Sequence, residues 1–259
     1  MPSTPISKDF SRDAGGNEKS SALTRAPGHT PAGAPLSPED AADLAPALAA
    51  AAEALPFGDS AGPEIHTVCV YCSSSNALGE KYKQLAAETA AEITAAGLKL
   101  VYGGGDVGLM GIVAREVKRQ GGHVTGIIPT FIKDKEVGFL DGDELIEVET
   151  MRERKAAMEL HSDAFLVLPG GFGTLEEMLE ILALKQLHRH DKNIVLLNAF
   201  GFYDHLLALF EHFYTERIAG EKCRALFTVA TTPAEALHQL IHTPRFARTD
   251  KWYETAGEE

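Results

Sequence analysis

The sequence predicts a doubly wound, Rossmann-like α/β fold, in which a parallel sheet is covered by helices on both faces. From residue 64 onward, short apolar runs that are typical of strands alternate with longer amphipathic runs. The apolar runs show no regular polar alternation, which is typical of strands buried on both faces. Strand-like and helix-like runs that follow each other in turn indicate β-α units and therefore a parallel sheet.

The elements follow this alternation along the chain. Strands are predicted at residues 65–72, 98–104, 123–129, 144–149, 163–171 and 193–198. Helices are predicted at residues 80–97, 108–122, 150–162, 174–188, 201–218 and 233–241. A less regular segment at 130–150 contains the fourth strand. Gly97 closes the first helix and Pro129 ends the third strand, as these residue types commonly do.

The composition changes near residue 62 and divides the chain into an extension and one domain. Residues 1–62 are rich in Ser, Pro, Ala and Gly, so we predict an N-terminal extension that is largely disordered. Its Ala-rich stretch 37–58 is compatible with a partial helix that begins at Pro38. Residues 63–250 form the predicted domain, and residues 251–259 form a polar tail.

Charge and hydropathy argue against two kinds of partner. The chain has 259 residues and a formal net charge of −13, whereas nucleic-acid surfaces need clustered Lys and Arg. No apolar run reaches the roughly 18 residues that a membrane span needs, and the first residues lack a signal-peptide pattern. We therefore expect a cytoplasmic protein that binds neither nucleic acid nor membrane.

The cysteines do not indicate a disulfide framework or a metal site. Cys69 and Cys72 form a CxxC pair, but they lie in a predicted strand, where positions i and i+3 face opposite sides. A redox CxxC usually opens a helix, and zinc would need a second pair of ligands. We interpret Cys69 as a buried strand residue and Cys72 as an incidental neighbour.

Loops that follow the predicted strands carry the candidate ligand-binding residues, because doubly wound folds bind ligands at the carboxyl ends of their strands. After the first strand, residues Ser73 to Asn76 offer hydroxyl and amide groups to a ligand. Ordinary turn chemistry explains the same residues nearly as well. Both interpretations stay open at this point.

The loop after the second strand matches GxGxxG, the dinucleotide fingerprint, at Gly103, Gly105 and Gly108. Two observations argue against NAD: the loop follows the second strand, and no acidic residue follows the third strand to hold the ribose. A redox dehydrogenase is therefore a weak alternative. We expect only that Gly104 and Gly105 let backbone N–H groups approach an anionic or sugar group.

The third loop, within LVLPGGFGTLEE, carries the strongest signal. Gly170, Gly171 and Gly173 permit positive φ and close approach, and Thr174 is expected to begin a helix. The free N–H groups and the positive end of the helix dipole then form a phosphate site. The same letters match a capping box, in which Glu177 folds back on the N–H of Thr174. A capping box alone, however, does not require three glycines.

Cations open the helix predicted at 150–162. Arg152, Arg154 and Lys155 lie near its start, where the helix dipole disfavours positive charge, so an anion nearby is one explanation. The other is a solvated helix face on which these cations pair with Glu153 or Glu159. The sequence alone does not decide between the two.

Together these segments resemble the LONELY GUY (LOG) family of cytokinin riboside 5'-monophosphate phosphoribohydrolases, many of which are labelled possible lysine decarboxylases. Pro169 to Glu177 match the family motif PGGxGTxxE, and Met151 to Lys155 match its MxxRK. The stretches YCSSS, LVYGGGDVGLMG and GIIPTFI are similar to earlier blocks of the family. The resemblance covers roughly residues 65–245.

The resemblance implies a set of site residues. Arg154 and Glu177 match the two catalytic positions. Matches to substrate-binding positions are Glu136, Lys155, Gly171, Phe172, Gly173, Thr174, Leu175 and Glu176. We add four residues of the strand-end loops: Ser73, Gly104, Gly105 and Gly170. Where the family has His and Thr, this chain has Arg152 and Ala183, which leaves the base preference open.

The implied reaction is hydrolysis of the N-glycosidic bond of N6-modified adenosine 5'-monophosphates, which releases the free base and ribose 5-phosphate. A carboxylate such as Glu177 would stabilise an oxocarbenium-like centre or deprotonate the attacking water. The glycine loop would hold the 5'-phosphate, and Arg154 would clamp the substrate or assist the leaving base. The reaction needs neither a metal nor an organic cofactor.

Alternatives of other kinds remain open. The same loops would serve a non-catalytic nucleotide or cofactor carrier, or a nucleosidase with a broader range of nucleoside monophosphates. The family resemblance also implies a homodimer. The helix predicted at 174–188 is apolar enough to contact both the sheet and a partner helix, although amphipathicity does not distinguish the two.

Overall fold

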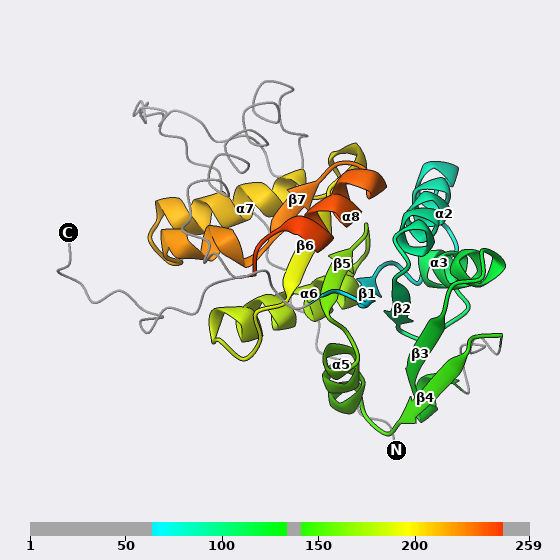
Figure 1. Ribbon diagram of the computed structural model, residues 1–259. Coiled ribbons are helices and arrows are strands. Elements are labelled where there is room, and N and C mark those ends of the chain that lie inside the picture. Colours follow the sequence, from blue (N-terminus) through cyan, green and yellow to red (C-terminus); the bar gives the residue numbers. More distant parts are fainter. Residues whose placement is uncertain (1–63, 134–140, 246–259) are drawn as a thin grey trace, which may run out of the picture. The chain divides into compact units, whose positions relative to one another are not determined.

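The computed structural model describes residues 64–133 and 141–245, which contain one sheet of seven parallel strands (Figure 1). The strand order is β4-β3-β2-β1-β5-β6-β7, so the chain winds outward in both directions from the central pair β1 and β5. This arrangement confirms the predicted doubly wound α/β fold. The predicted extension 1–62, the tail 251–259 and Glu136 lie outside the described residues.

The strands are β1 (Thr67–Tyr71), β2 (Lys99–Tyr102), β3 (Val124–Pro129), β4 (Glu144–Val148), β5 (Ala164–Val167), β6 (Asn193–Leu197) and β7 (Thr228–Ala230). The α-helices are α2 (Glu80–Ala95), α3 (Gly108–Arg119), α4 (Thr130–Lys133), α5 (Met151–Leu160), α6 (Phe172–Gln186), α7 (Asp204–Thr215) and α8 (Pro233–His242). Two 3-10 helices are η1 (Ala199–Gly201) and η2 (Glu221–Leu226). None of the described helices is long and apolar enough to cross a membrane.

Each predicted strand and helix has a counterpart in the structure. Four elements were not predicted, namely α4, β7 and the two 3-10 helices. They are too short to show a hydrophobic period, which is the signal on which the prediction depends.

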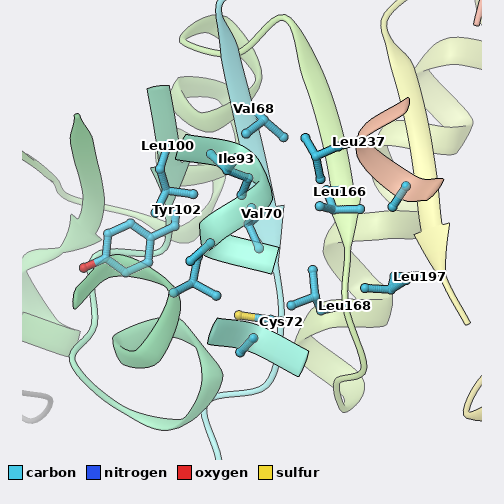
Figure 2. Close-up of a cluster of buried hydrophobic side chains, with 14 of the residues drawn as sticks. Val68, Val70, Cys72, Ile93, Leu100, Tyr102, Leu166, Leu168, Leu197 and Leu237 are labelled. Carbon is cyan, nitrogen blue, oxygen red and sulfur yellow. The ribbon is translucent and has the colours of Figure 1, made fainter. Parts of the chain in front are cut away.

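Each face of the sheet buries its own apolar cluster. Helices α2, α3 and α8 pack on one face, against a cluster that includes Val70 and Leu166 (Figure 2). Helices α5, α6 and α7 pack on the other face, against Phe165 among others. Cys69 belongs to the second cluster and Cys72 to the first, and both thiols are free. The prediction that these two cysteines face opposite sides of a strand is confirmed.

The strands β1 and β5 form the topological switch point of the sheet. They are hydrogen-bonded neighbours, yet the helices that follow them, α2 and α6, pack on opposite faces. The loops at their carboxyl ends therefore diverge, and this is where doubly wound sheets bind ligands. The candidate loops after β1, β2 and β5 all lie at this edge.

A substitution at Leu166 tests whether this side chain belongs to the hydrophobic core. Its side chain is fully buried in the middle of the sheet, so Leu166→Ala is expected to lower the free energy of unfolding by about 2–5 kcal/mol through the cavity it leaves. Urea denaturation followed by circular dichroism measures the change. Leu160→Ala removes a side chain that is 80% exposed on α5, and it should change the free energy by less than about 0.5 kcal/mol. Equal losses would contradict the assigned core.

Candidate active site

Hydrogen bonds join the loops at the carboxyl ends of β1, β2 and β5. The Ser73 N–H donates to the Pro169 carbonyl at 3.3 Å, and the Leu109 N–H donates to the Ser73 carbonyl at 2.9 Å. The Gly108 N–H donates to Oδ1 of Asn76 at 2.8 Å. The loop after β1 is thus hydrogen-bonded to both the loop after β2 and the loop after β5. The bonds of Gly108 and Leu109 also mean that these two N–H groups at the start of α3 already have acceptors.

The glycines after β2 serve close packing within the protein. Gly108 has φ +56°, and a Cβ atom there would lie 2.5 Å from the carbonyl carbon of Ser74. Gly104 has φ +77°, and its Cβ would lie 2.9 Å from Cβ of Ile128. Gly105 is also buried. Close packing therefore accounts for Gly108 of the GxGxxG pattern and for Gly104 beside it.

Helix α6 begins at Phe172, two residues before the predicted start. Gly171 is its N-cap, in an extended conformation with φ −94° and ψ −151°, and it makes no side-chain capping bond. The alternative interpretation of Thr174 and Glu177 as a capping box is therefore excluded, because Glu177 lies in the second turn. Gly170, Gly171 and Gly173 permit positive φ, but none of the three adopts it.

The first turn of α6 is open to solvent at two of its glycines. A Cβ atom on Gly171 or Gly173 would meet no atom within 4 Å, whereas one on Gly170 would clash with Thr174. Phe172 between them is 94% exposed. The N–H groups of the first turn have no partner within the helix and carry the positive end of its dipole. An anion can approach them closely at this point.

Arg154 connects α5 to the sheet. Its side chain is buried, its Nε donates to the carbonyl of Ile127 at 3.3 Å, and its Nη2 donates to the carbonyl of Gly103 at 3.2 Å. A Cβ atom on Gly103 would overlap Nη2 of Arg154. The glycine thus provides the space for the guanidinium group, and two carbonyls orient it, one directly after β2 and one within β3.

Glu177 faces this guanidinium group. Its Oε1 lies 3.7 Å from Nη1 of Arg154, and each of the two side chains is only 11% exposed. Burial raises the pKa of Glu177 to about 7, while the positive charge of Arg154 opposes the rise. The carboxyl group can therefore exchange a proton close to neutral pH, as a general acid or base requires.

Lys155 pairs with carboxylates of α6. Its Nζ contacts Glu176 and Glu180, and these hydrogen bonds raise the pKa of the lysine. Neither Glu153 nor Glu159, the partners considered from the sequence, forms an ion pair with Lys155 among the described residues. Glu153 instead closes a capping box with Thr150 at the start of α5. Lys155 thus faces the acidic residues of α6.

The structure brings some predicted site residues together and gives others a local role. Arg154, Lys155, Glu176 and Glu177 meet where α5 faces α6. The hydroxyl of Ser73 accepts from the Ser75 N–H at 3.1 Å, which is ordinary turn chemistry. The exposed residues Arg152 and Ala183 mark the two departures from the family motif.

Two residues of this region were missed by the sequence analysis. Tyr203 donates its hydroxyl to the Leu168 carbonyl at 2.7 Å and ties the segment after β6 to the loop after β5. Nothing in the sequence pointed to that contact. Glu180 follows Glu176 by four residues and therefore shares its helix face, which is a signal that could have been used.

The fold and these side chains define an α/β protein of the Rossmann type, with an open, glycine-lined helix start and a buried Arg–Glu pair at its switch point. Residues 110–240 match the family model described as "Possible lysine decarboxylase". The chain is 44% identical over 173 residues to cytokinin riboside 5'-monophosphate phosphoribohydrolase LOG5 of Arabidopsis thaliana, which covers 67% of this chain and 76% of that protein. It is 45% identical over 173 residues to the probable phosphoribohydrolase LOGL9 of Oryza sativa subsp. japonica, with the same coverage of 67% and 76%. The chain belongs to the LOG family of cytokinin riboside 5'-monophosphate phosphoribohydrolases.

Solved structures share the fold at lower identity. The molybdenum cofactor carrier protein of Chlamydomonas reinhardtii aligns with a TM-score of 0.51 and 24% identity, over 67% of this chain and 94% of that chain. The molybdenum cofactor binding protein of Rippkaea orientalis aligns with a TM-score of 0.52 and 21% identity, over 68% of this chain and 96% of that chain. These likenesses show the fold alone.

A substitution at Gly103 tests whether this glycine provides the space for the guanidinium group of Arg154. Gly103→Ala places a methyl group where Nη2 of Arg154 lies, so the guanidinium group must leave its carbonyl partners. The free energy of unfolding is expected to fall by about 1–3 kcal/mol. Gly173→Ala adds the same methyl group in open space within a helix, and stability should stay unchanged or rise by up to about 1 kcal/mol. Similar values for the two variants, measured by urea denaturation, would contradict the assigned role of Gly103.

The raised pKa of Glu177 predicts a pH dependence of stability. The pKa in the folded protein is about 7 and the ordinary value is 4.5, so the protonated carboxyl group stabilises the folded state fully below pH 4.5. This contribution is lost as the pH rises through 7, because the unfolded chain then binds fewer protons. The variant Glu177→Gln has no titrating group at this position, so its stability does not fall with pH for this reason.

From about pH 5 to pH 8, the stability of Glu177→Gln relative to the wild-type protein should therefore rise by roughly 2 kcal/mol. Urea denaturation across this pH range measures the difference. Glu88→Gln, at an exposed site on α2, serves as the control and should show no such trend. A difference between Glu177→Gln and wild type that does not change with pH would refute the raised pKa.

Proposed function

We propose that this protein hydrolyses the N-glycosidic bond of N6-modified adenosine 5'-monophosphates and releases the free base, a cytokinin, together with ribose 5-phosphate. The observation that carries the proposal is the buried Arg154–Glu177 pair next to the open first turn of α6. The relatives that are 44% and 45% identical bear the name of this activity. The decarboxylase wording of the family model is only a label.

The 5'-phosphate is proposed to bind at the start of α6. The N–H groups of Phe172, Gly173 and Thr174 have no acceptor within the helix, and the lack of side chains on Gly171 and Gly173 leaves room for phosphate oxygens. A phosphate held here takes no part in bond cleavage. Its binding energy instead fixes the position of the ribose, which lowers the entropic cost of reaching the transition state.

Glu177 is proposed as the catalytic carboxylate. In its ionised form it stabilises the positive charge that develops at the anomeric carbon and accepts a proton from the attacking water. The bond between that carbon and the base nitrogen breaks, and its electron pair leaves with the base, which takes up a proton. A pKa of about 7 keeps a substantial fraction of Glu177 ionised at neutral pH.

Arg154 is proposed to orient Glu177 and to stabilise negative charge on the leaving base. Two backbone carbonyls fix its Nε and Nη2, so Nη1 is held in place on the side that faces Glu177. A guanidinium group held in this way needs little reorganisation as charge develops, which is how electrostatic catalysis works. Such a role depends on the guanidinium geometry, and lysine would not reproduce it.

The remaining site assignments are proposals of the same kind. We propose that Lys155 and Leu175 contact a bound nucleotide and that Glu176 lies beside it as an ion-pair partner of Lys155. Four residues of the neighbouring loops are proposed to complete the site, namely Ser73, Gly104, Gly105 and Gly170. Glu136 remains a prediction, because it lies outside the described residues. No metal or organic cofactor is needed for this chemistry.

A cytoplasmic homodimer is the proposed form of the protein. Helix α6 and the residue after it present Phe172, Leu179 and Leu187 to solvent in the single chain, at 94%, 46% and 49% exposure. An apolar helix face of this kind supports a contact with a second copy. The net charge of −13 makes nucleic acid an unfavourable partner.

The direct test compares Glu177→Gln with the wild-type protein on AMP and isopentenyladenosine monophosphate. Chromatography of the released base should show turnover by the wild-type protein and a loss of about 10²–10⁴-fold in the variant, because the amide cannot accept the proton. Calorimetry should show that the variant still binds AMP, since the phosphate site is intact. Glu88→Gln should retain wild-type turnover.

Two outcomes would go against the proposal. Tight nucleotide binding without turnover by the wild-type protein would favour a non-catalytic carrier. Comparable release of base from several unmodified nucleoside monophosphates would favour a broader nucleosidase.

A further inference from the structure

Helices α5 and α6 are joined by two sets of ion pairs. The inner contact is Arg154 with Glu177, and both side chains are shielded from solvent. The outer set is Lys155 with Glu176 and Glu180. Lys155 is only 14% exposed, whereas its partners Glu176 and Glu180 are 55% and 39% exposed. One ammonium group thus lies between two carboxylates that flank Glu177 along the helix.

We propose that Glu180 is a positioning residue for the reaction: it is the permanent counter-ion of Lys155 and holds the ammonium group ready to bind the nucleotide phosphate, while Glu176 is the partner that the phosphate displaces. The inference rests on the proposed function, because it concerns the same phosphate site. It gives a role to Glu180, which the motif comparison did not single out.

The different positions of the two carboxylates support this division. Glu176 is the more exposed of the two and lies one turn closer to the start of α6, where the phosphate is proposed to bind. A phosphate arriving there adds roughly two negative charges next to Glu176. The exposed Glu176 can turn into solvent at little cost in desolvation, because it keeps its hydration. Lys155 has three N–H donors, so it can bind the phosphate and remain bound to Glu180.

Glu180 also acts on Glu177 through its charge. Burial is the main cause of the raised pKa of Glu177, and the negative charge of Glu180 raises that pKa further, whereas the positive charge of Lys155 lowers it. The charged and titratable groups around Glu177 come from three parts of the chain. They are Arg154 and Lys155 on α5, Glu176 and Glu180 on α6, and Cys69, Tyr71 and Cys72 on β1 and directly after it. Glu180→Gln removes one of these negative charges and therefore lowers the pKa of Glu177.

The binding experiment uses full-length protein that carries Glu177→Gln, so that AMP is not consumed. In this background, Glu180→Gln should weaken AMP binding by roughly threefold to tenfold in calorimetry, because Lys155 loses its anchor. Glu176→Gln should leave AMP binding unchanged or tighten it, because it removes the carboxylate that competes with the phosphate. Once Lys155→Met is added, Glu180→Gln should have no further effect on the affinity.

The second measurement needs no nucleotide. The difference in stability between Glu177→Gln and the wild-type protein, followed across pH, reports the pKa of Glu177. The same difference is then measured with Glu180→Gln present in both proteins, and its midpoint should move to lower pH, because the negative charge that raises the pKa of Glu177 is gone. A purely structural role of Glu180 would lower stability equally at every pH and leave the midpoint where it was.

Several results would overturn the inference. Equal losses of AMP affinity in Glu180→Gln and Glu176→Gln would remove the distinction between the two carboxylates. A loss in Glu180→Gln that persists with Lys155→Met would show that Glu180 does not act through the lysine. A separate result concerns the proposed function: wild-type protein that binds AMP but releases no base would refute the hydrolysis and any role of Glu180 in it, whereas an effect of Glu180 on AMP binding would remain measurable.

Discussion

The guanidinium group of Arg154 is the contact on which the arrangement of the site depends. It donates to one carbonyl within β3 and to one directly after β2, and it faces a carboxylate of α6, so one side chain of α5 fixes the relative positions of four elements. Gly103 allows this contact because any side chain there would occupy the space of the guanidinium group.

The same contact explains the chemistry of Glu177. A carboxyl group buried to this extent would strongly prefer its neutral form, and a guanidinium group in direct contact would strongly favour the ionised form. At 3.7 Å the attraction offsets only part of the desolvation, and the pKa remains raised at about 7. The distance is therefore as important as the identity of the two residues, since a closer pair would keep Glu177 ionised and make it a weaker base.

The sequence predicted the alternation of strands and helices because burial on both faces leaves a long, regular apolar signal. It failed where the outcome depended on contacts between distant segments. Gly103 and Gly108 of the GxGxxG pattern pack against Arg154 and the loop after β1, and Gly104 packs against Ile128. The pattern itself gives no sign of these contacts. Likewise, no local rule indicates that Lys155 pairs with residues of α6 rather than with its helical neighbours.

The start of α6 shows why the choice between two local interpretations matters for function. A capping box at Thr174 and Glu177 would have bonded the carboxylate to the backbone and satisfied N–H groups of the first turn. Because the helix instead begins at Phe172 with an uncapped Gly171, those N–H groups remain open and Glu177 lies deep enough to face Arg154. The earlier start thus separates the open first turn from the carboxylate by about one helical turn. The proposed phosphate binding and the proposed proton transfer therefore fall on different parts of the same helix.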